Sequence, residues 1–133
     1  MQVNALDHVN IITDKLEESA AFYAALLDLE RRDAPPPLTP QNAQWMYDAG
    51  GKAILHLNSV DCPRTYERQV EPGELTGSIH HVALNCSGYD TVIARLEARG
   101  ASYKTNTVVA IGLRQVFTAD PSNVLLELNF FGD

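Results

Sequence analysis

Basic residues are scarce in this chain, and their scarcity narrows the range of partners. Lys and Arg number 10 against 17 Asp and Glu, which gives a formal net charge of −7 at pH 7. Nucleic acids and acidic membrane surfaces are bound by clustered Lys and Arg. Because the basic residues here are scattered, we expect neither nucleic acid nor a membrane as a partner, and a small molecule as the substrate.

The chain also lacks long apolar runs and closely spaced cysteines. No stretch approaches the roughly 18 to 20 apolar residues that a membrane helix needs, and the first residues do not form a secretion signal. Cys62 and Cys86 share no short metal-binding spacing, and two such thiols are expected to stay reduced. We therefore expect a cytoplasmic protein, whose 133 residues suffice for one domain.

The chain does contain a diverged internal repeat. Residues 7–11 (DHVNI) resemble residues 80–84 (HHVAL), with a spacing of 73 positions. Residues 54–58 (ILHLN) resemble residues 125–129 (LLELN), with a spacing of 71 positions. Since nearly the same period relates both pairs, the sequence predicts two copies of one structural unit.

Each copy has the pattern of a strand, an amphipathic helix and three further strands, which predicts an α+β fold of two βαβββ modules. The expected strands cover residues 6–12, 30–33, 44–48, 52–58, 79–85, 101–107, 113–119 and 123–130, and the helices cover about 15–29 and 89–99. Module one covers about residues 5–60, a connection about 59–78 and module two about 79–131. Together they form the single domain 1–133.

Four side chains of metal-binding type stand on the first and last strand of the two copies: His8, His56, His81 and Glu127. Because side chains alternate along a strand, the apolar neighbours of each must face the other way and carry the helices. By the same rule His80 points away from the site. Three imidazoles and a carboxylate suit one divalent Ni, Co, Mn, Fe or Zn ion. The competing interpretation is a hydrogen-bonded cluster without metal, which would leave Glu127 costly to bury unless it is paired.

Further residues on the same strands are candidates for substrate binding. Asn10 and Asn129 follow two ligands by two positions and so share their face. Trp45 and Tyr47 share one face of a neighbouring strand, where they line a substrate subsite or belong to the core. Arg114 is a candidate anchor for a carboxylate group, against the alternative of a solvated side chain.

A duplicated βαβββ unit with such ligands resembles the vicinal oxygen chelate superfamily, which includes lactoylglutathione lyase, methylmalonyl-CoA epimerase, extradiol dioxygenases, and fosfomycin and bleomycin resistance proteins. The resemblance covers essentially the whole chain and includes the closing motif at residues 117–128 (FTADPSNVLLEL). It implies a cup-shaped, barrel-like sheet with helices on its outer face, a divalent ion inside, and a homodimer. The ion would chelate two neighbouring oxygens of a small substrate.

The resemblance favours a glyoxalase-like isomerase, lyase or epimerase, in which Glu127 binds the metal and can serve as a base. An extradiol dioxygenase would instead use His8, His81 and Glu127, leaving His56 as an acid or base. Against it, residues 112–117 (GLRQVF) lack the His and Tyr that such enzymes carry before the closing Glu. A third class, a protein that sequesters an antibiotic without turnover, normally lacks the metal ligands.

Overall fold

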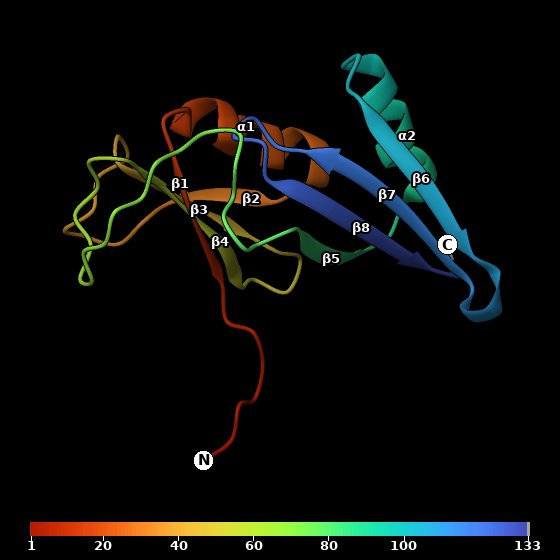
Figure 1. Ribbon diagram of the computed structural model, residues 1–133, viewed down its shortest axis with the longest axis horizontal. Helices are drawn as coiled ribbons and strands as arrows, with labels where there is room; N and C mark the ends of the chain where they lie inside the picture. Colours follow the sequence, from red (N-terminus) through yellow and green to blue (C-terminus); the bar gives the residue numbers. More distant parts are fainter. Residues whose placement is uncertain (133) are drawn as a thin grey trace. The chain divides into compact units, whose positions relative to one another are not determined.

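The computed structural model describes residues 1–132, which form two compact units that meet in sequence at Pro72 and Gly73. Each unit has the order strand, helix and three strands, with a four-stranded mixed sheet (Figure 1). The fold is therefore α+β and consists of two βαβββ modules, as the sequence predicted.

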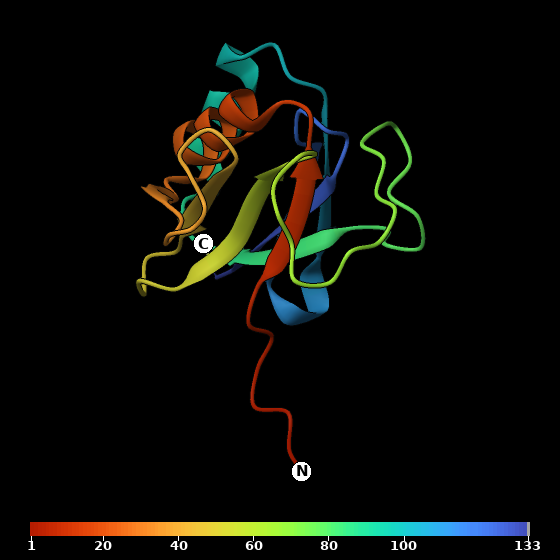
Figure 2. The same ribbon diagram turned by 90° about the vertical axis from the view of Figure 1, so that its left-hand side faces the viewer.

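The first unit builds its sheet from strands that are distant in sequence. Its elements are β1 (Val9–Thr13), α1 (Leu16–Leu27), β2 (Glu30–Asp33), β3 (Ala43–Tyr47) and β4 (Ala53–Ser59). The strand order is β1-β4-β3-β2, in which β1 runs parallel to β4 and the other neighbours are antiparallel. A parallel pair needs a long crossover connection, and α1, β2 and β3 provide it (Figure 2).

The second unit repeats this topology. Its elements are β5 (Val82–Cys86), α2 (Tyr89–Ala98), β6 (Tyr103–Val108), a short 3₁₀ turn (Val109–Ile111), β7 (Leu113–Ala119) and β8 (Leu125–Phe131). The strand order is β5-β8-β7-β6, again with the first and last strands parallel. Within residues 1–132, no helix is both long and apolar enough to span a bilayer.

The first strand of each unit begins three residues later than the sequence pattern predicted. The alternation of apolar residues extends back to Leu6 and Ile79, but the parallel ladders start only at Val9 and Val82. Backbone pairing, which side-chain alternation does not reveal, sets these boundaries. His8 and His81 consequently lie immediately before β1 and β5 and not within them.

The helix-bearing side of each sheet is apolar, as predicted. In the first unit α1 packs on β3 and β4, where Leu55 and Leu57 are fully buried. In the second unit Leu126 and Leu128 are equally buried, and Tyr89 of α2 meets the Phe130 ring edge-on, with 5.4 Å between centroids. Burial of each such leucine contributes about 2 kcal/mol of transfer free energy.

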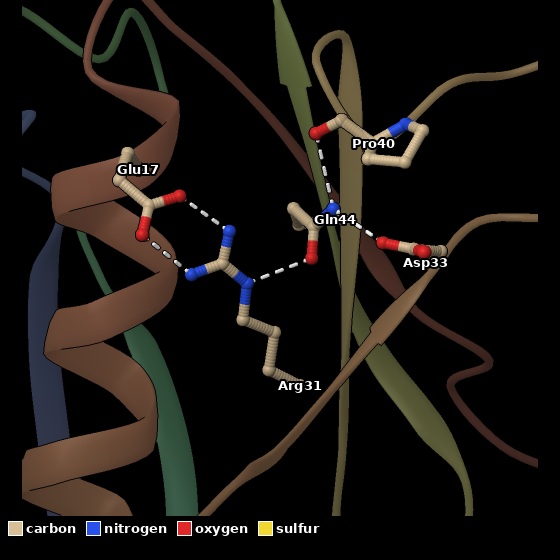
Figure 3. Close-up of polar contacts among 5 residues, drawn as sticks. All are labelled: Glu17, Arg31, Asp33, Pro40 and Gln44. Carbon is tan, nitrogen blue, oxygen red and sulfur yellow. Dashed lines mark hydrogen bonds and ion pairs between the residues drawn. The ribbon is translucent and has the colours of Figure 1, made fainter.

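A polar network ties α1 to the edge of the first sheet (Figure 3). The guanidinium of Arg31 donates to both carboxylate oxygens of Glu17 and to Gln44 Oε1, the last at 2.7 Å. Gln44 is buried, and its Nε2 donates to Asp33 Oδ1 at 2.9 Å and to the Pro40 carbonyl at 3.1 Å. The hydrogen bond from Arg31 lowers the pKa of the Glu17 carboxyl.

The turn before the last strand of each unit has the same hydrogen bonds in both copies. Asp120 Oδ1 accepts from the backbone N–H groups of Ser122 and Val124, both at 2.8 Å. Asp48 Oδ1 accepts in the same way from the backbone N–H groups of Gly50 and Lys52, at 3.0 and 2.9 Å. In both turns the residue three positions after the Asp has a left-handed backbone: φ is 81° at Gly51 and 62° at Asn123. The duplication therefore extends to the turn chemistry.

We predict that Asp120→Ala lowers the free energy of unfolding by about 2 kcal/mol, because it leaves two N–H groups without their acceptor at a site where Asp120 is only 5% exposed. Asp48→Ala should cost less, because water reaches this half-buried turn. Urea denaturation followed by circular dichroism measures both. Asp120→Asn keeps a side-chain oxygen and serves as the control. Equal and negligible losses for the two alanine variants would contradict the argument.

Candidate functional site

In the first unit, His8 and His56 lie face to face. Their ring centroids are 3.8 Å apart and their planes differ by 11°. Trp45, which is opposite His56 in the β3–β4 ladder, stacks on the same imidazole at 3.8 Å and 7°. Two rings at this distance must occupy the two faces of His56, so this imidazole is sandwiched between His8 and Trp45.

A hydrogen bond determines which nitrogen of His8 is free, and burial lowers the pKa of His56. His8 Nδ1 lies 2.7 Å from Asp7 Oδ2, and this bond lowers the pKa of the Asp7 carboxyl. With Nδ1 engaged, Nε2 of His8 is the nitrogen that remains to bind a metal or substrate. Burial lowers the pKa of His56 below its usual 6.5, and repulsion by His8 lowers it further, whereas Asp7 and a backbone hydrogen bond at Ala53 act in the opposite direction. His56 is therefore neutral at pH 7 and keeps a lone pair.

In the second unit, His81 and Glu127 form the corresponding pair. His81 Nε2 lies 3.2 Å from Glu127 Oε2, and the Glu127 side chain is only 16% exposed. His81 Nδ1 lies 2.9 Å from His80 Nδ1. The expectation that His80 points away is wrong, because both histidines precede β5 and strand alternation does not govern them.

The other carboxylate oxygen of Glu127 is bound by amides. Gln115 Nε2 donates to Glu127 Oε1 at 2.8 Å, and Asn129 Nδ2 donates to the same oxygen at 3.0 Å. Gln115 also donates to Asn129 Oδ1 at 3.0 Å and accepts from Asn106 Nδ2 at 2.7 Å. The carboxylate is thus partly compensated by protein groups, of which the sequence analysis named Asn129 but not Gln115. Gln115 lies opposite Asn129 on β7, a register that only the folded structure reveals.

The predicted substrate-binding asparagine of the first unit, Asn10, is exposed and is hydrogen-bonded to another asparagine. Asn10 Nδ2 donates to Asn58 Oδ1 at 2.8 Å, and the buried Asn58 donates to Cys62 Sγ at 3.0 Å. Asn10 lies opposite His56 in the β1–β4 ladder. It is near the predicted ligand, while its amide nitrogen already has a protein acceptor.

Two aromatic residues predicted to line a subsite share the face of His56. Trp45 packs against a small buried cluster, Ala34, Ala43 and Cys62, and its buried Nε1 has no hydrogen-bond partner in the described part of the chain. The Tyr47 ring carries the Arg32 guanidinium 4.2 Å from its centroid. Trp45 therefore joins the imidazole stack to the core.

Arg114 lies on the other side of the second sheet from Glu127. It is opposite Phe130 in the β7–β8 ladder, whereas Phe117 is opposite Glu127. Its guanidinium lies 3.8 Å from the Tyr89 ring centroid and 4.0 Å from Asp90 Oδ1. The structure does not bring Arg114 and Glu127 to one face.

One of the two residue pairs, His81 and Glu127, has a spacing that fits neighbouring ligands of one metal ion. Within residues 1–132, no group of three His, Cys, Asp or Glu side chains is placed to hold an ion. Two ligands at about 2.1 Å from one ion and at right angles are about 3 Å apart. The 3.2 Å between His81 Nε2 and Glu127 Oε2 matches that spacing. Each unit therefore supplies two of the four predicted ligands.

Comparison with curated proteins identifies a relative from a plant. The chain is 24% identical over 130 residues to "Glyoxylase I 4" of Arabidopsis thaliana, an alignment that covers 96% of this chain and 71% of the relative.

Solved structures show the same fold. A putative glyoxalase family protein from Bacillus anthracis is 17% identical, with a TM-score of 0.72 over 98% of both chains. The fosfomycin resistance protein FosX from Listeria monocytogenes is 20% identical, with a TM-score of 0.65 over 97% of this chain and 94% of that one. A mutant of FosX, solved in complex with Mn(II) and 1S,2S-dihydroxypropylphosphonic acid, has a TM-score of 0.63 at 20% identity, over 96% of this chain and 90% of the other.

A family model matches residues 5–128, nearly the whole chain. This match confirms the resemblance to the vicinal oxygen chelate proteins that the repeated motifs indicated. The chain belongs to the Glyoxalase/Bleomycin resistance protein/Dioxygenase superfamily.

Proposed function

We propose that this chain is a metal-dependent enzyme in which His8, His56, His81 and Glu127 hold one divalent transition-metal ion. The observation that carries the proposal is the 3.2 Å approach of His81 Nε2 to Glu127 Oε2, a spacing suited to neighbouring ligands of one ion. The FosX mutant solved in complex with Mn(II) supports it, since that protein has this fold and binds a divalent ion. The ligand pairs come from two units, of one chain or of two chains in a homodimer.

The surroundings of each imidazole suit this role. His8 directs Nδ1 to Asp7, and His81 directs Nδ1 to His80, so both offer Nε2. A partner on the second nitrogen sets the tautomer and the ring orientation of a metal-binding histidine. For His81 this requires the proton on Nδ1, donated to His80, and a lone pair on Nε2.

The reaction we infer is a glyoxalase-like isomerisation, lyase reaction or epimerisation of a small molecule with two neighbouring oxygens. A bound divalent ion would polarise such an oxygen and stabilise the negative charge that develops on it. Glu127 Oε2, once released from the ion, would accept a proton from the adjacent carbon and return it. The "Glyoxylase I 4" relative supports this class of chemistry.

The geometry gives less support to ring cleavage. An extradiol dioxygenase would use His8, His81 and Glu127, with His56 as the acid or base. Phe117, which is opposite Glu127 on β7, brings no hydroxyl donor to that face. Oxygen uptake with a panel of catechols would nevertheless be evidence for the dioxygenase reaction. Tight binding of an antibiotic without formation of product would be evidence for sequestration.

We predict that the purified protein binds about one divalent ion per chain. Elemental mass spectrometry measures the content, and readdition of Ni, Co, Mn, Fe or Zn after chelation should raise the melting temperature, because the ion binds only the folded state. The double variant His81→Ala/Glu127→Ala should lose both effects, while Asp90→Asn, at an exposed carboxylate on α2, should keep them. A chain that neither retains nor responds to any of these ions would overturn the proposal.

We predict that His56 titrates below 6.5 in the metal-free protein. Because its folded pKa is lowered, its contribution to stability is complete above about pH 6.5 and is lost as the pH falls toward the folded pKa. His8→Ala should move the His56 pKa upward, since it removes a covering ring and a repelling charge. Nuclear magnetic resonance of the ring protons measures this shift, with Glu18→Gln on the outer helix as the control. An unchanged His56 pKa in His8→Ala would contradict the stacking argument.

We predict that Glu127→Gln lowers kcat by at least about 100-fold, because it removes the base. The amide oxygen of the new side chain still accepts from Gln115 and Asn129, so the fold should remain intact by circular dichroism. Conversion of methylglyoxal–thiol adducts, α-hydroxycarbonyl compounds and catechols provides the assay. Full turnover in this variant would exclude Glu127 as the base.

A further inference from the structure

Four polar side chains form a continuous line across the face of the second sheet that carries Glu127. Asn106 on β6 is opposite Gln115 on β7, and Gln115 is opposite Asn129 on β8. Each is linked to the next by a hydrogen bond of 2.7 to 3.0 Å, and the line ends on Glu127 Oε1. Two of the amides donate directly to the Glu127 carboxylate, and the third holds one of them.

The direction of every hydrogen bond in this line follows from the charge on Glu127. An ionised carboxylate only accepts, so Gln115 must turn its amino group toward it. The two amino hydrogens of Gln115 then go to Glu127 Oε1 and Asn129 Oδ1. The carbonyl of Gln115 is left to face Asn106, which donates to it. Every amide nitrogen in the line therefore donates to an oxygen, and no two donors face each other.

The consequence is that the two oxygens of Glu127 have different surroundings. Oε1 accepts two amide hydrogen bonds, whereas Oε2 has His81 Nε2 as its neighbour at 3.2 Å. At 16% exposure the side chain has little water to compete with these bonds. Glu127 is therefore presented through Oε2 alone.

The first unit has no counterpart to this arrangement. Its residue opposite Asn58, at the position equivalent to Gln115, is the buried Ala43, which has no hydrogen-bonding side chain. There the ligand is His56, oriented by stacking on Trp45. An imidazole can be held by its ring faces, but a carboxylate needs donors. The second unit, whose candidate ligand is a carboxylate, has a glutamine at this position, and the first unit has an alanine.

We propose that Gln115, held by Asn106, is a positioning residue that fixes Glu127 so that Oε2 alone is available, to bind the metal ion and, once released from it, to take the substrate proton. This proposal rests on the proposed function above and adds to it which oxygen acts and which side chain selects it. Without the amide from Gln115, Oε1 keeps only the bond from Asn129, and Asn129 itself loses the bond that Gln115 donates to it. The carboxylate is then less restrained, and Oε1 can turn toward the ion as well.

The test compares three variants of the whole chain. Gln115→Met keeps the length of the side chain but removes both donors, and it should weaken Mn(II) or Ni(II) binding about 10- to 100-fold in competition with a fluorescent chelator. Asn106→Ala leaves the bond to Glu127 but frees Gln115 to turn, so its loss should be smaller. Thr105→Ala, next to Asn106 on the opposite face of β6, should bind as the unaltered chain does.

A spectroscopic readout separates positioning from general stability. With Co(II) bound, the visible absorption of Gln115→Met should change in position and intensity, because the carboxylate changes its mode of binding, while that of Thr105→Ala should not. Should Gln115→Met fail to fold, Asn106→Ala decides by the same two measurements. Unchanged affinity and spectrum in a folded Gln115→Met, or in Asn106→Ala when it alone folds, overturn the role of Gln115 while leaving the proposed function intact. Absence of metal binding by the unaltered chain overturns both.

Discussion

The parallel pairing of the first and last strand in each unit determines where every candidate ligand lies. In the first unit it places His8 beside His56, because Val9 pairs with Leu55. In the second it places His81 beside Glu127, because Val82 pairs with Leu126. Residues about 45 positions apart in sequence become neighbours through a crossover that needs a helix and two strands. The apolar side of the same strands binds the helix, so one pattern builds both the core and the site.

The two pairs of candidate ligands are held in place by different physical means. His56 is neutral and lies between the flat faces of His8 and Trp45, where burial keeps its pKa low. Glu127 is charged and cannot be held by stacking, so it is bound by the amides of Gln115 and Asn129. Duplication therefore conserved the backbone topology and the Asp turns while the side chains around each ligand diverged according to its charge.

Membership of the superfamily gives the fold, whereas the reaction that we propose depends on the residues of this chain. Phe117 opposite Glu127 lacks the hydroxyl that ring cleavage would use, and Arg114 stacks on Tyr89 on the opposite side of the sheet. What remains on the Glu127 face is a carboxylate with one protein-bound oxygen and one oxygen toward His81. This arrangement is the basis on which we propose proton transfer beside a polarised oxygen.

The sequence by itself determined the duplication, the βαβββ order and the apolar faces, because these depend on periodicity and on residues that repeat at a spacing of 71 to 73. It also indicated His56 and Glu127, since each interrupts an apolar strand. Only the tertiary structure decided that His80 contacts His81, that Arg114 faces α2, and that Gln115 and Asn106 bind Glu127. These contacts depend on where strand pairing begins and on which residues become opposite, and neither can be read from alternation along a single strand.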